Sequence, residues 1–294
     1  MRDNFIFERE IRSKDKKYYR YFYPIHCSVK PEVERLFSEM AKRLDGLFLE
    51  DDAIRIDTLS LELENTIFLV QDILKTRFPN CFLELFETLN RQDVIKFYDF
   101  DSDYLTWCYD NGRGNCNYVS QYLDDCFLYL TLQNEFYDVA NLIHELSHFV
   151  IGDFQEYFAW TYLGELLPIF SEFVVFDYAI EHFPNHPTIF FQLCERYKEI
   201  LETLEFSKTK EHYTDTYDYY DRSNYAFCFL LASFLYEKYL NYPEKTMDKI
   251  MKFSKGYGVL HFNRLMEILG VKLKYYDGKL HYEEQDLEVL FDRL

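Results

Sequence analysis

The stretch NLIHELSHFVIG, residues 141–152, decides how this chain folds and which chemistry it can support. His144, Glu145 and His148 form an HExxH pattern, in which positions i and i+4 lie on one face of a helix, one turn apart. Two imidazoles so placed can bind one zinc ion, and Glu145, displaced by one residue, can act as a general base toward a water. A chance match is expected only roughly 0.02 times in a sequence of this composition.

The residues around this pattern are apolar on nearly every side, which is typical of a buried helix. Two histidines and a glutamate inside such a helix need partners, and a metal ion supplies them. The sequence therefore predicts one zinc ion per chain, held in part by His144 and His148. The apolar flanking residues are Val139, Ala140, Leu142, Ile143, Leu146, Phe149, Val150 and Ile151.

A catalytic zinc site keeps three protein ligands and one open position, so a third ligand must lie elsewhere in the chain. Phe154 stands where longer versions of the pattern have a third histidine. Of the downstream carboxylates, Glu156 is too near the helix end to fold back easily. Glu172 ranks first, because it lies among apolar residues in a predicted helix with Pro168 in its first turn. Glu165 ranks second. The other interpretation of Glu172 is a carboxylate near the start of a helix, where the helix dipole favours negative charge.

The composition predicts a mostly helical protein. Hydrophobic residues make up 48% of the 294 residues, which excludes a disordered chain, and only 9 Gly and 7 Pro favour long helices. The 32 basic residues against 51 acidic ones give a net charge of −19, which argues against nucleic acid and anionic membrane surfaces as partners. The sequence has no stretch of about 20 apolar residues and no signal-peptide pattern, so we expect no membrane span.

The seven cysteines include no CxxC pair, and we expect reduced thiols in a cytoplasmic protein. Hydrophobic periodicity predicts helices and one strand, and turn residues predict breaks between them. The expected helices begin at Pro31, cover about 57–77 and 80–89, and return from Asp138; a strand covers 126–133, breaks fall at 164–168, 206–222 and Pro243, and a hairpin surrounds 277–278.

Several segments together resemble one known family. CFLYLTLQNEFYDVANLIHELSHFV, residues 126–150, resembles the strand, short connection and HExxH helix of the oligoendopeptidase F and thimet oligopeptidase family of zinc peptidases. The spacing from His148 to Glu172 is similar to that family's distance to its glutamate ligand. MDKIMKFSKGYGVLHFNRLMEILGVKL, residues 247–273, resembles the family's final helices, and LELFETLNRQDVIKFYDFDSD, residues 83–103, resembles an upstream helix and turn.

The resemblance implies a helical zincin-type core with a small β element before the HExxH helix. Residues 1–80 would be an N-terminal helical extension packed on the core, and residues 81–294 the catalytic core. The family binds the peptide backbone along an edge strand, which the resemblance places at 126–132. The glycines at 112 and 114 would then let a neighbouring loop approach the substrate.

The family also uses a tyrosine from a late helix to stabilise the tetrahedral oxyanion. The matching segment is YDYYDRSNYAFCFLLASF, residues 217–234, where Tyr225 and Tyr220 are the candidates. This segment departs from the family pattern, as does Ser147, which stands where the family has glycine.

These features predict a zinc metallo-endopeptidase of the HExxH…E type that hydrolyses peptides. His144, His148 and Glu172 would hold the zinc, and Glu145 would move the proton. The alternative is a catalytically weak or inactive peptidase-like protein that binds peptides or a protein partner and keeps zinc for structure.

Overall fold

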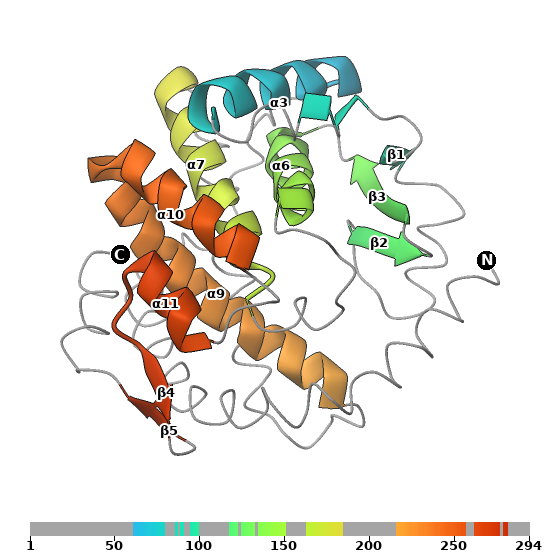
Figure 1. Cartoon of the computed structure of the whole chain (residues 1–294). Coiled ribbons are helices and arrows are strands. Elements are labelled where there is room, and N and C mark those ends of the chain that lie inside the picture. Colours follow the sequence, from blue (N-terminus) through green and yellow to red (C-terminus); the bar gives the residue numbers. More distant parts are fainter. Residues whose placement is uncertain are drawn as a thin grey trace, which may run out of the picture. The chain divides into compact units, whose positions relative to one another are not determined.

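The computed structural model places eleven segments of the chain (Figure 1), and all structural statements below concern these segments. The expected helix from Pro31, the glycines at 112 and 114, Glu156 and most of the expected helix 80–89 lie outside them. The segments are 61–79, 86–87, 89–90, 95–99, 118–122, 125–132, 135–150, 163–184, 216–256, 262–276 and 279–281.

The chain divides into two compact units, which are described separately. One unit comprises residues 52–152 and 167–195, and the other comprises residues 1–51, 153–166 and 196–294. The division falls inside helix α7 (Leu166–His182). Leu166 is counted with the unit that holds residues 153–166, and the rest of the helix with the unit that holds residues 167–195.

The first unit is built around helix α6 (Phe136–Val150), which carries the HExxH pattern. Asp138 fixes its start, because the Asp138 carboxylate accepts a hydrogen bond from the Glu135 backbone N–H at 3.2 Å, as in the second half of a capping box. Figure 1 shows α6 between α7 and a small sheet, and α3 (Leu63–Arg77) packs against α6. The expected start of α3 near residue 57 is wrong by several residues, since Glu62 is still extended.

The sheet beside α6 contains three strands in the order β1-β3-β2. β1 (Ile95–Asp99) pairs in parallel with β3 (Asp125–Leu132), and β2 (Tyr118–Tyr122) pairs with the other side of β3 in antiparallel fashion. β3 is therefore the central strand, and the expectation that 126–132 forms an edge strand is wrong. It pairs with β2 over Asp125–Tyr129 on one side and with β1 over Leu128–Leu132 on the other, so neither side offers a peptide a full-length edge.

The core of this unit consists of apolar side chains from α3, α6 and α7. The ring centroids of Phe136 and Phe176 lie 6.3 Å apart, and Phe183 lies 6.3 Å from Phe136 on an edge-to-face geometry. Such pairs add to the stabilisation that burial itself provides. α3 contributes a buried stripe made of Thr66, Val70, Ile73 and Leu74.

Truncation of Phe176, whose side chain is 1% exposed, tests this core. Phe176→Ala should lower the free energy of unfolding by about 3–5 kcal/mol, because a large buried ring is lost and a cavity remains. Phe68→Ala is the matched control on α3, where the ring is 68% exposed, and should change that free energy by less than about 0.5 kcal/mol. Equal effects in urea titrations of the two variants would contradict this packing.

The second unit contains the long helix α9 (Thr216–Asn241), α10 (Pro243–Gly256) and α11 (Phe262–Leu269). α10 packs against both α9 and α11, and it begins at Pro243, a residue suited to the first helical position. The expected break at 206–222 is too long, since α9 already begins at Thr216. β4 (Lys274–Tyr276) and β5 (Lys279–His281) form the expected antiparallel hairpin.

The prediction of a mainly helical protein is confirmed over the placed segments. None of the helices in these segments has both the length and the apolar content that crossing a lipid bilayer requires.

Candidate metal centre

Helix α6 places the three residues of the HExxH pattern in the interior. The exposed fractions of His144, Glu145 and His148 are 5%, 6% and 7%. The two imidazole rings lie with centroids 5.3 Å apart and planes at 75°, as expected for neighbours one turn apart. Burial of three ionisable side chains on one helix is costly unless they bind one another or a shared ligand.

Ser147 stands beside His148 on the same buried helix. Its hydroxyl donates a hydrogen bond to the Ile143 backbone oxygen at 2.7 Å, one turn earlier. The buried serine hydroxyl therefore has a hydrogen-bond acceptor, because the backbone of the helix supplies one. The departure from the family's glycine is absorbed locally and leaves both histidines in place.

A carboxylate from the start of α7 completes a group of three ligand-type side chains. Donor atoms of His144, His148 and Glu165 all lie within 4.8 Å of one another. Glu165 is the residue directly before α7 begins at Leu166, and it is half-buried. Three such donor atoms can bind a single metal ion together, whereas any two of these side chains alone would bind it weakly.

Glu172 lies on the same helix but meets the group differently. Its Oε1 atom is 2.5 Å from His144 Nδ1, and its side chain is buried, with 4% of the residue exposed. A histidine that binds a metal through one ring nitrogen commonly donates the other N–H to a carboxylate, which fixes the tautomer and the ring orientation. The position of Glu172 suits this orienting role.

The donor set fits zinc. Two imidazoles and one carboxylate are the ligands of a known class of catalytic zinc site, which leaves a fourth position open. The hard cations Mg²⁺ and Ca²⁺ prefer sites made of oxygen atoms, so two nitrogen donors argue against them. Glu145, one residue after His144, is a buried carboxylate that does not belong to this group of three donors.

The sequence predicted His144, His148 and Glu145 as site residues and ranked Glu172 above Glu165 as the third ligand, and these roles stay predictions. The structure places Glu165 with the two histidines. The two glutamates are seven residues apart, which returns to nearly the same helix face after two turns. That spacing is the signal that both could approach α6 together.

The predicted oxyanion donors lie on α9. The backbone of α9 includes both Tyr220 and Tyr225, and the catalytic role of either residue stays a prediction. Cys228, further along the same helix, is buried and forms no disulfide.

No protein-family model and no curated protein sequence matches the chain. Solved structures do match its fold. A protein from Chlamydophila abortus assigned as a peptidase has a TM-score of 0.60 at 14% identity, over 92% of this chain and 54% of that one. A protein from Bacillus anthracis str. Ames assigned as an oligoendopeptidase F has a TM-score of 0.56 at 12% identity, over 94% of this chain and 54% of that one.

PZ peptidase A, solved with an inhibitor, gives a TM-score of 0.56 at 12% identity, over 90% of this chain and 56% of that one. The chain thus spans about half the length of each of these structures. Its fold is that of oligoendopeptidase F-like peptidases, as the resemblance implied.

Proposed function

We propose that this chain is a zinc-dependent metallopeptidase that hydrolyses peptide bonds in peptides. The observation that carries the proposal is the convergence of His144, His148 and Glu165 within 4.8 Å, beside Glu145 on a buried helix. The fold shared with peptidase structures supports the same reaction class.

In this proposal Glu145 moves the proton. Zinc at such a site supplies Lewis acidity, which polarises the scissile carbonyl and favours deprotonation of the attacking water. Glu145 accepts the proton of that water and passes it to the leaving amine nitrogen. A late tyrosine, Tyr225 or Tyr220, would donate a hydrogen bond to the oxyanion.

The peptide backbone would bind along an edge of the small sheet. β3 lies between the other two strands, so β1 and β2 are the outer strands of the placed sheet. β2 is the better candidate, because it contacts α6 and thus lies near the helix that carries Glu145. Backbone hydrogen bonds to such an edge are a general mode of peptide recognition.

Within the site, we assign Glu165 as the third ligand and Glu172 as the residue that orients His144. Glu165→Gln should weaken zinc binding by more than about 100-fold, because an anionic ligand is lost. Glu172→Gln should weaken it by about 10- to 100-fold, as expected for a partner of a ligand. Competition with a chromogenic chelator measures both values, and a larger loss for Glu172→Gln would exchange the two roles.

The function itself is tested by metal analysis and a quenched fluorescent peptide library. We expect one zinc per chain and cleavage that a chelator abolishes and added zinc restores. Full zinc occupancy with no peptide cut by the chain would instead support a peptide-binding protein with a structural metal.

A further inference from the structure

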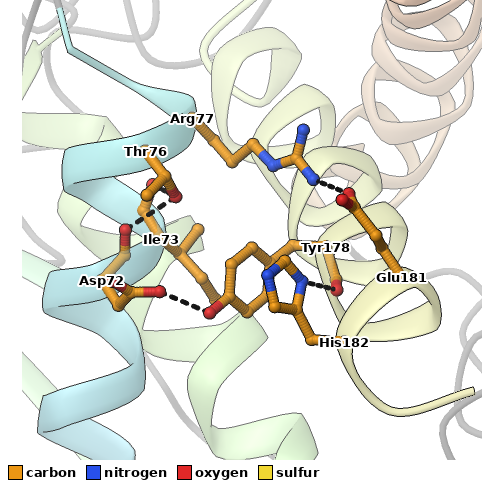
Figure 2. A network of polar contacts seen from close by, with 7 residues as sticks. All are labelled: Asp72, Ile73, Thr76, Arg77, Tyr178, Glu181 and His182. Carbon is orange, nitrogen blue, oxygen red and sulfur yellow. Dashed lines mark hydrogen bonds and ion pairs between the residues drawn. The ribbon is translucent and has the colours of Figure 1, made fainter.

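A second polar cluster joins α3 to α7, beyond the candidate metal centre (Figure 2). The Tyr178 hydroxyl donates a hydrogen bond to Asp72 Oδ2 at 2.5 Å. Arg77 pairs with Glu181, and its guanidinium lies 5.8 Å from the centre of the Tyr178 ring. The His182 ring stacks on Tyr178 with centroids 3.9 Å apart and planes at 14°.

Tyr178 is the centre of this cluster. Only 4% of the residue is exposed, and burial together with the hydrogen bond to Asp72 raises its pKa to about 12. The phenol therefore stays protonated, and remains a donor to Asp72, throughout the physiological pH range. By contrast, the Glu181 side chain is 63% exposed, and an ion pair that exposed contributes little to holding two helices together.

One of the two helices joined by this hydrogen bond, α7, also belongs to the candidate metal centre. α7 carries Glu172 six residues before Tyr178, and Glu165 is the residue directly before the helix begins. α3 meets α7 through the Asp72–Tyr178 and Arg77–Glu181 contacts, and it packs on α6, which carries His144. α3 is thus a common support for both helices that supply candidate ligands.

Helix geometry couples the positions of Glu172 and Tyr178, which both lie within α7. Six residues correspond to a rise of about 9 Å and a rotation of about 240°, so Tyr178 and Glu172 point in different directions from one rigid helix. Tyr178 points toward α3 and Glu172 toward His144. A rotation of α7 about its axis that breaks the first contact must therefore also displace the second.

We propose that Tyr178 is a positioning residue for the metal centre, which acts through its hydrogen bond to Asp72 by fixing the rotation of α7. This inference rests on the proposed zinc site. Metal sites lose affinity when ligands are held in the wrong orientation, even when every ligand is present. The Asp72–Tyr178 contact would hold the Glu165 and Glu172 carboxylates in register with His144.

Tyr178→Phe tests the proposal, because it removes the hydroxyl and keeps the ring that packs against His182 and Arg77. The zinc dissociation constant of the full chain should rise about three- to tenfold, and the visible spectrum of the cobalt(II)-substituted chain should change. Glu181→Gln is the matched control on the same helix, and should leave both readouts within twofold of the unmodified chain.

Asp72→Asn, a weaker acceptor of similar shape, provides a second variant should Tyr178→Phe fail to fold, and its affinity should shift in the same direction. The double variant should lose no more affinity than Tyr178→Phe alone, because both changes remove one contact. A lower melting temperature with unchanged zinc affinity and cobalt spectrum would overturn the inference alone. Absence of stoichiometric zinc in the unmodified chain would overturn the proposed function and this inference with it.

Discussion

Glu145→Gln is expected to reduce kcat/KM for peptide cleavage by about 10²- to 10⁴-fold while one zinc remains bound per chain. Glutamine has nearly the same shape as glutamate, but its amide cannot accept a proton from water and return it to the leaving amine. The residue is 6% exposed, so bulk solvent is poorly placed to substitute for it. The loss should appear mainly in kcat, because peptide binding does not depend on this carboxylate.

Glu244→Gln is the matched control for this experiment. Glu244 lies exposed in the first turn of α10, and its replacement makes the same change in net charge and side-chain chemistry. Its kcat/KM should stay within twofold of the unmodified chain. Activity of Glu145→Gln within tenfold of the unmodified chain would assign proton transfer to another group.

His144→Ala is expected to abolish stoichiometric zinc binding and, with it, chelator-sensitive cleavage. Two donors remain in the group, which is too few for a stable catalytic site. The same change also removes a hydrogen-bond partner of buried Glu172, so the zinc-free chain should itself lose about 1–3 kcal/mol of unfolding free energy. Metal analysis after dialysis and urea titration of the apo chain measure the two effects.

Two further variants separate these effects. His148→Ala should lose zinc equally well, but it leaves the contact between His144 and Glu172 intact and should destabilise the apo chain less. His281→Ala, in β5 of the small hairpin, should retain one zinc per chain. Full zinc binding by His144→Ala would remove this histidine from the ligand set.

The parts of the site that depend on local spacing were predictable. HExxH on an apolar helix specifies which side chains share a face, and α6 forms where that pattern lies. Pro168 marked the first turn of α7, a position that suits proline. The break expected at Pro243 falls where α9 ends at Asn241 and α10 begins at Pro243. These features need no information from distant parts of the chain.

The choice between Glu165 and Glu172 could not be made in the same way. Glu165 directly precedes α7 and Glu172 lies within it, seven residues later, and the apolar neighbours of Glu172 favoured it as the ligand. The structure supplies another partner for that buried carboxylate, the Nδ1 atom of His144, 28 residues away. Only the packing of α7 on α6 reveals that pairing.

Strand order was beyond reach for a similar reason. An apolar stretch such as CFLYLTL indicates a strand, but it does not say whether neighbours lie on one side or both. The parallel partner of β3 is β1, about thirty residues earlier, and pairing over that distance leaves no periodic signal in the sequence.

The order of these strands also sets the order of events during synthesis. β3 is the last of the three strands in the chain and the middle one in the sheet, so β1 and β2 have no mutual pairing to form before it. A nascent chain ending before residue 125 carries both strands with open hydrogen-bonding edges, which are prone to pair with other chains. Once Asp125–Leu132 has been synthesised, β3 can pair with one edge of β1 and with one edge of β2. The HExxH helix follows after only a short connection.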